Sequence, residues 1–153
     1  MQTCFFIGHR EAPDDLYPAL YDAVLRHIED YGVTDYVVGH YGRFDALAAR
    51  AVREAKKMHP DVQLSLLLPY HPAEREARQA EQYDSLFYPP DQETVPRRVA
   101  IVRANRYMVD HCVDHCAYLI AYAWHPASNA RDLVEYAMRR GIGVTNLASN
   151  APR

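Results

Sequence analysis

Short apolar runs of strand type alternate along the chain with longer segments in which apolar residues recur at helical spacing. The runs predict strands over residues 3–7, 35–38, 63–68, 117–122 and 142–146, with a weaker strand over 84–88. The helical segments between them are expected from about 15 to 31, through 44–55, over 73–82, over 96–115 and over 129–140. Strand, helix and strand joined by short loops favour a mostly parallel sheet with right-handed crossovers.

This alternation predicts an α/β fold, a three-layer Rossmann-like sandwich with a mostly parallel central sheet, formed by a single domain over 1–153. The weak strand is expected at the outer edge of the sheet, beside the strand over 63–68. In the first helix Leu16, Leu20, Val24 and Ile28 share one stripe, and Gly32 is expected to end the helix.

The long helix over 96–115 has an unusual stripe. Its expected buried positions are Ile101, Asn105, Met108, Cys112 and Cys116. Asn105 is the polar member of this stripe, so a buried position requires a hydrogen-bond partner for it.

Composition narrows the classes of function. The chain has 153 residues, of which 49% are hydrophobic and 24% charged, and its net charge is −3. These values are typical of a globular protein, and without a basic stripe they make nucleic-acid binding an unfavoured function. No apolar run in the chain, that at Leu66–Leu68 included, is long enough to span a membrane. Three cysteines without an export signal indicate reduced thiols and a cytoplasmic protein.

Candidate binding residues follow three of the expected strands, where open parallel sheets bind ligands. They are Gly8, His9 and Arg10 in the first loop, then Gly39, His40, Tyr41, Gly42 and Asp45, and finally Ser128 and Asn129. Glycines would let a ligand approach the backbone amides, and Arg10, Arg103 and Arg106 would hold phosphate. Arg43 would add a further phosphate contact. Alternatively, the glycines serve turns and the arginines are solvated.

Other chemistry is weakly supported. His111, Cys112, His115 and Cys116 interleave two pairs at i, i+4 spacing, but the cysteines lie on the expected buried stripe, and no metal site is expected. No nucleophile and base form a recognisable pair. The 12 tyrosines could stack on a base or cover a homodimer interface, and the sequence does not decide between these.

The segment Cys4–Arg10, with its Gly8-His9-Arg10 loop, resembles the opening of the YpsA-like branch of the SLOG superfamily. Gly39–Ala49, Arg103–Asp110 and Asn129–Ala137 resemble three further segments of that branch, in the same order. The superfamily also includes DprA-type DNA-processing proteins and the Lonely-guy phosphoribohydrolases. The resemblance implies a Rossmann-like fold and a site for a nucleotide or nucleotide-derived ligand.

The phosphoribohydrolases carry PGGxGTxxE where this chain has Pro126–Asp132, so the glycines and the catalytic glutamate are missing. Asp132 lies close to the expected acid and is the weak catalytic candidate. The leading hypothesis is therefore binding, or sensing, of a small nucleotide-like ligand by a homodimer or higher homo-oligomer. The alternatives are an N-glycosidase acting on nucleoside monophosphates and a tyrosine-rich protein-interaction module.

Overall fold

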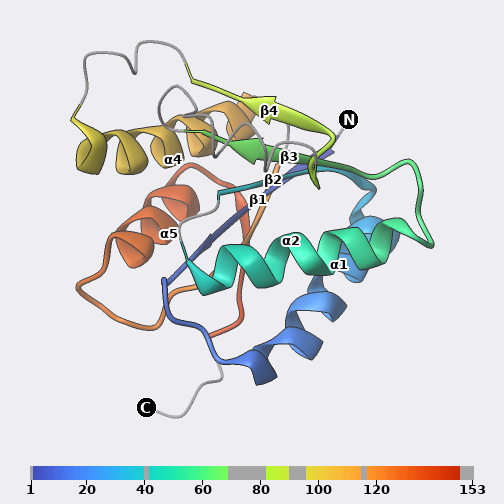
Figure 1. Cartoon of the computed structure of the whole chain (residues 1–153). Helices are drawn as coiled ribbons and strands as arrows, with labels where there is room; N and C mark the ends of the chain where they lie inside the picture. Colours follow the sequence, from blue (N-terminus) through green and yellow to red (C-terminus); the bar gives the residue numbers. More distant parts are fainter. Residues whose placement is uncertain (1, 40–41, 69–81, 90–95, 115–116, 149–153) are drawn as a thin grey trace.

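A single parallel sheet organises the part of the chain that the computed structural model describes, residues 2–39, 42–68, 82–89, 96–114 and 117–148, with the backbone alone at 97–98 and 111–114 (Figure 1). Its strands run in the order β4-β3-β2-β1-β5-β6, and every neighbouring pair is parallel. The bounds are β1 Gln2–Gly8, β2 Val33–Val38, β3 Gln63–Leu67, β4 Ser85–Phe87, β5 Tyr118–Tyr122 and β6 Gly143–Asn146.

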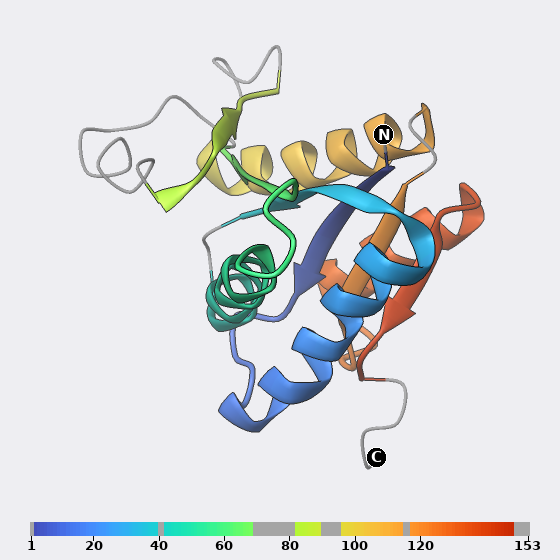
Figure 2. The same ribbon diagram turned by 90° about the vertical axis from the view of Figure 1, so that its right-hand side faces the viewer.

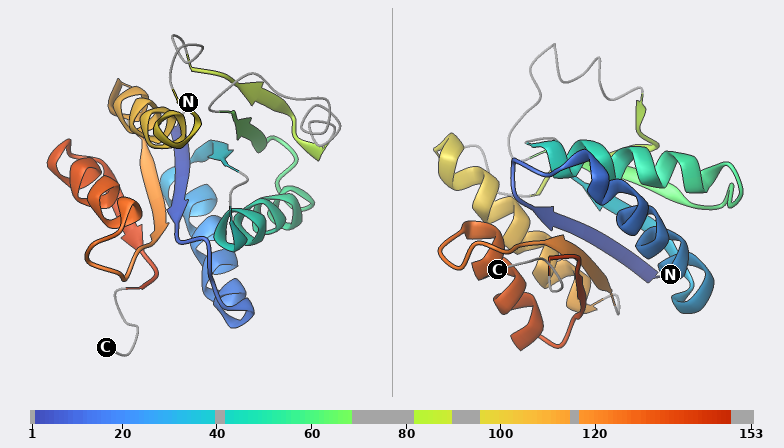
Figure 3. Two further views of the ribbon diagram at one scale, coloured as in Figure 1. Left: turned by 60° about the vertical axis from the view of Figure 1, so that its left-hand side comes forward. Right: turned by 90° about the horizontal axis from the view of Figure 1, so that it is seen from below.

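Helices cover both faces of this sheet, as Figures 2 and 3 show. On one face lie α1 (Tyr17–Tyr31), entered through the 3-10 turn η1 (Asp14–Leu16), and α2 (Arg43–Lys56). On the other face lie α4 (Arg97–Asp114) and α5 (Asn129–Arg139). The predicted α/β, three-layer Rossmann-like fold is confirmed.

Alternation along β1 explains why two layers of helices are needed. Cys4 and Phe6 point into the core shared with α1 and α2, whereas Phe5 and Ile7 point into the core shared with α4 and α5. All four side chains are at most 5% exposed. A strand that is apolar at every position must be buried on both faces, which favours the parallel arrangement.

The direction in which the strands are added reverses at β1. The chain proceeds from β1 through β2 and β3 to β4 on one side, and then crosses to β5 and β6 on the other side. The crevice beyond the carboxyl ends of the strands at such a reversal is where open α/β sheets bind ligands. In this protein that crevice is bounded by the residues after β1 and β2 and by the start of α5.

Several local predictions are confirmed. The weak strand pairs with β3 at the outer edge, with Leu86 opposite Leu66. Gly32 ends α1 in the left-handed conformation, with φ of 69°. The helix expected over 73–82 falls on residues that are outside the described ranges, except for Gln82. No described helix is both long and apolar enough to cross a bilayer.

The predicted buried stripe of α4 is confirmed at Met108 and wrong at Ile101 and Asn105, whereas the side chains of Cys112 and Cys116 lie outside the description. Ala100, Ala104, Met108 and Val109 face the core, each at most 1% exposed. Ile101 and Asn105 are only partly buried and line a cavity instead. Small alanines let α4 pack closely on the sheet, and the neighbouring stripe is left free to face the crevice.

Candidate functional site

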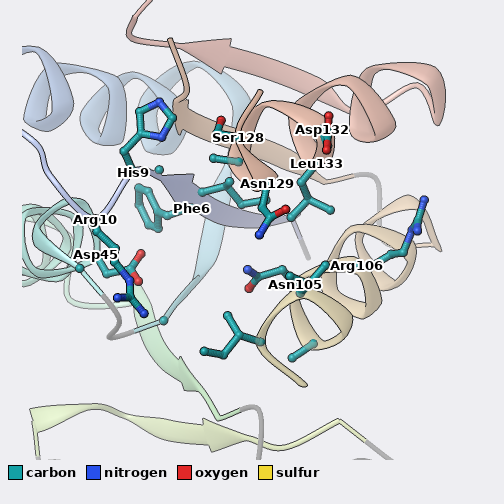
Figure 4. Close-up of a pocket in the computed structure, with 18 of the residues that line it drawn as sticks. Phe6, His9, Arg10, Asp45, Asn105, Arg106, Ser128, Asn129, Asp132 and Leu133 are labelled. Carbon is teal, nitrogen blue, oxygen red and sulfur yellow. The ribbon is translucent and has the colours of Figure 1, made fainter. Parts of the chain in front are cut away.

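A cavity of about 600 Å³ lies at the carboxyl edge of the sheet, next to the strand-order reversal (Figure 4). Its walls come from the end of β1, the residues after β2, the first turns of α2 and α5, and the amino-terminal half of α4. A volume of this size is ordinary for a small-molecule site. Of the predicted binding and catalytic residues, it is lined by Gly8, His9, Arg10, Gly39, Gly42, Asp45, Arg106, Ser128, Asn129 and Asp132.

Three predicted residues are not placed in the cavity. His40 and Tyr41 lie outside the described residues. Arg103 is exposed on α4 and is not part of the cavity wall, although Arg106, three residues further along, is. Three positions place Arg106 about 60° around the helix axis from Arg103 and about 4.5 Å further along it, and only Arg106 lines the cavity.

Gly8 and Gly42 serve close packing. A Cβ at Gly8 would lie 2.3 Å from Cδ2 of the buried Phe44, and a Cβ at Gly42 would lie 2.5 Å from the Arg10 Cα. Neither glycine has a positive φ. The main chain is locked at this point by the Arg43 amide, which donates to the Arg10 carbonyl at 2.7 Å. Close packing therefore explains the lack of a side chain at both positions, and the expectation that their backbone approaches a ligand stays a prediction, since both glycines line the cavity.

His9 ties the first loop to the loop after β5. Its Nε2 accepts hydrogen bonds from the backbone amides of Trp124, at 3.0 Å, and His125, at 3.2 Å. Both partners are donors, so Nε2 is unprotonated and the neutral ring carries its proton on Nδ1. Burial lowers the pKa of His9 below its usual value, and the nearby His125 lowers it further. His9 therefore positions the rim of the cavity as a neutral acceptor.

The loop between β5 and α5 is also satisfied internally. Ser128 caps α5 by accepting from the Arg131 amide at 3.1 Å, while its hydroxyl donates to the His125 carbonyl. The Ala127 amide donates to His125 Nδ1, and the Ser128 amide donates to the His125 carbonyl. A serine at the N-cap position normally accepts from a backbone amide of the first helical turn in this way. The N-terminus of α5 thus reaches the cavity with few free donors.

The arginines near the site are engaged to different degrees. Arg43 forms an ion pair with Asp14 of η1. We expected it to hold a phosphate, but this ion pair engages its guanidinium instead. Arg106 lies over the ring of Tyr136, with its guanidinium carbon 4.2 Å from the ring centroid. The hydroxyl of Tyr136 donates to Asp110, and this joins α4 to α5. Figure 4 shows Arg10 beside Asp45 at the opposite side of the cavity from Arg106.

Sequence reasoning missed Asn105 as a cavity residue. It lines the cavity from α4, and its side chain and that of Asn129 point toward one another in Figure 4. Asn105 makes no hydrogen bond with another described residue. The signal was present, because an unpartnered polar side chain in an apolar stripe is unusual in a core and ordinary at a binding site. Phe6, Leu67, Ile101 and Leu133 supply apolar walls, although the expected buried stripe of the helix placed Ile101 in the core.

The tyrosines and the interleaved histidines and cysteines were the remaining candidates for binding. Tyr31 is the one exposed tyrosine among the ten that the structure describes, at 42%. Of the other nine, Tyr36 is buried and the rest are partly buried, and a tyrosine-rich interaction surface stays a prediction. Residues 115–116 and the side chains at 111–112 lie outside the description, which leaves the interleaved histidines and cysteines untested. No metal-binding group of three or more ligands occurs within the described ranges.

No protein-family model matches this sequence, and no curated protein matches it. Among solved structures, it is similar to the X-ray structure of DNA processing protein A (DprA) from Streptococcus pneumoniae, with a TM-score of 0.53 and 9% sequence identity. The match covers 95% of this chain and 58% of that chain, so this protein corresponds to little more than half of its structural relative. The likeness shows a DprA-like Rossmann fold.

Proposed function

We propose that the cavity at the carboxyl edge of the sheet binds a nucleotide or a nucleotide-derived ligand. The observation that carries the proposal is the position of a 600 Å³ cavity beside β1, where the strand order reverses. The four segments that resemble the YpsA-like branch of the SLOG superfamily supply most of the residues that line this cavity. The likeness to DprA concerns the Rossmann-like fold alone, and the ligand class is our inference.

The cavity wall offers two kinds of contact to such a ligand. Ile101, Leu133 and the exposed edge of Phe6 give apolar wall against which a base can pack, and Asn105 and Asn129 offer donors and acceptors for its edge. Arg10 and Arg106 each present a cation at the wall, on different sides. Mostly apolar walls with a few converging polar groups are typical of a small-molecule site.

Calorimetric titration with AMP, cyclic AMP, NAD and ADP-ribose tests this proposal, together with thermal unfolding at saturating ligand. A ligand at a hundred times its Kd adds about 2.7 kcal/mol to the free energy of unfolding, a Tm rise of about 5–10 °C for a chain of this size. The proposal would be contradicted if none of these ligands, and none of guanosine, cytidine, uridine or their phosphates, gave a heat of binding or a Tm shift.

Arg106 and Arg103 provide a matched pair of variants. They lie three residues apart on α4, both exposed, yet Arg106 alone is part of the cavity wall. Arg106→Ala is expected to weaken binding about tenfold or more, in line with the loss of a charge-assisted hydrogen bond. Arg103→Ala is expected to leave affinity within about twofold. Equal effects of the two substitutions would move the site away from this cavity.

Asp132 favours a second candidate, an N-glycosidase that acts on nucleoside monophosphates. Its position in the first turn of α5, on the cavity wall, would let its carboxylate stabilise positive charge developing on a ribosyl ring. The test is release of free base from AMP, measured by chromatography. Release of free base that disappears in Asp132→Asn supports catalysis by this carboxylate. Release by the native chain that is no faster than in a protein-free blank refutes the N-glycosidase function.

The proposed homodimer and the tyrosine-mediated interaction module remain predictions. Light scattering of the purified chain measures the mass in solution. A monomer at micromolar concentration would refute the homo-oligomer, and no surface of clustered tyrosines among the described residues favours a protein partner.

A further inference from the structure

Two helices, α2 and α5, place their first turns on the cavity wall, and each carries an aspartate there. Asp45 occupies that position in α2 and Asp132 occupies it in α5, and both residues line the cavity. The positive end of a helix dipole normally attracts the phosphate of a bound nucleotide. Here a carboxylate already lies at each of these ends, so an added anion would meet negative charge at the positions where phosphate usually binds.

The backbone donors of the loop before α5 are also occupied. Of the seven amide N–H groups from Trp124 to Arg131, five already donate to protein acceptors. His9 takes two of them, His125 takes two, and the hydroxyl of Ser128 takes one. In this stretch, only the amides of Asn129 and Ala130 have no acceptor among the described residues and are left for a ligand. A pyrophosphate has many more acceptor atoms than two amides can satisfy.

The charged residues on the described cavity wall cancel. Arg10 and Arg106 are positive, and Asp45 and Asp132 are negative. His9 adds no charge, since its Nε2 is held as an acceptor by two amides. Arg106 is also engaged with the ring of Tyr136 at 4.2 Å. The wall therefore offers no excess of positive charge to two or more phosphates.

The same groups suit a ligand that is recognised through hydroxyls and ring edges. The Asp132 carboxylate can accept hydrogen bonds from a ribose diol, and the amides of Asn105 and Asn129 can each donate and accept. We infer that the occupant of this cavity is a nucleoside or nucleoside monophosphate, and that diphosphates and dinucleotides bind no better. This inference rests on the proposed nucleotide site and specifies which members of that class the site takes.

The test is isothermal titration of the whole chain with a phosphate series at constant salt. For each of the four bases the series is nucleoside, 5′-monophosphate and 5′-diphosphate, with ADP-ribose added for adenine. The expected result is that at least one nucleoside or monophosphate binds, and that its diphosphate has an equal or larger Kd. A diphosphate or ADP-ribose that binds ten times more tightly than both the matching nucleoside and monophosphate overturns the inference but leaves the proposed function intact. Absence of binding throughout the series overturns both.

A charge-neutralising variant tests the reason for the selectivity. In Asp45→Asn/Asp132→Asn the wall gains two units of positive charge without losing volume. The ratio of diphosphate to nucleoside affinity is expected to rise at least tenfold, with circular dichroism used to show that the variant is folded. The matched control is Asp22→Asn/Asp30→Asn, which neutralises two exposed carboxylates of α1 that are not on the cavity wall. An unchanged ratio in the first variant, or an equal rise in the control, would refute the electrostatic argument.

Discussion

Gly8→Ala is expected to destabilise the protein through one specific contact. The new methyl carbon would lie 2.3 Å from Cδ2 and 2.4 Å from Cγ of Phe44. Carbon atoms in contact are normally about 3.5–4.0 Å apart, so the ring would have to retreat by more than about 1 Å. Phe44 is fully buried, and its ring packs against those of Phe6 and Tyr122. Since the ring has no free space behind it, the cost should lie near the upper end of the range for overpacking, about 3 kcal/mol.

Urea unfolding followed by circular dichroism measures this change. A loss of about 3 kcal/mol from a typical free energy of unfolding of about 5–15 kcal/mol leaves a measurable folded baseline. Combining Gly8→Ala with Phe44→Leu provides the decisive comparison, because leucine lacks the ring carbons that cause the clash. The two substitutions should be non-additive, with the double variant about 1–2 kcal/mol more stable than the sum of the single effects predicts.

Gly32→Ala is the matched control for this experiment. Nothing lies within 4 Å of the added methyl group, and the strain comes from a φ of +69°. The expected loss is about 1–2 kcal/mol, with an effect that adds to that of Phe44→Leu. If Gly8→Ala changes stability by less than about 0.5 kcal/mol, or combines additively with Phe44→Leu, the steric explanation for Gly8 is refuted.

Three further predictions concern the core and the edge of the sheet. Asp84→Asn should lose about 1–2 kcal/mol in urea unfolding, since the carboxylate accepts from a lysine of α2 and from the Leu64 amide at 2.8 Å, and an unchanged midpoint would contradict this. Tyr36→Phe should lower the free energy of unfolding by about 1–2 kcal/mol, because the buried hydroxyl of Tyr36 donates to the Val24 carbonyl at 2.8 Å. An unchanged Tm in differential scanning calorimetry would contradict this. Burial lowers the pKa of His27 below 6.5, so unfolding takes up a proton and stability should fall as pH drops below about 6.5. The slope between pH 7 and pH 5 should be shallower in His27→Leu, and an equal slope in both proteins would refute the assignment.

Local sequence predicted most of the framework because its signals act over a few residues. The apolar run at Cys4–Ile7 requires burial on both faces, which a parallel strand between two helical layers provides. Gly32 adopts the left-handed conformation that ends α1, as expected for a glycine after the last apolar turn. The strand-end loops also predicted the edge of the sheet where the cavity lies, because the carboxyl ends of parallel strands share one edge.

Side-chain roles within the site depended on distances between segments far apart in the chain. Gly42 is required by the backbone of Arg10, and His9 accepts from amides more than a hundred positions away. In the first turns of α4 the buried positions come one residue earlier than predicted, so Asn105 lies on the cavity wall and not in the core.

The amino-acid sequence alone therefore determined the order and type of the elements and the edge of the sheet at which they converge. Only the tertiary structure decided which glycines pack against protein atoms, which amides are already bonded, and that the two helix ends at the cavity each present a carboxylate. The physical reason is range. Periodicity and turn geometry are set by neighbouring residues, whereas steric contact, hydrogen-bond partnership and net charge at a site are set by atoms that folding alone brings together.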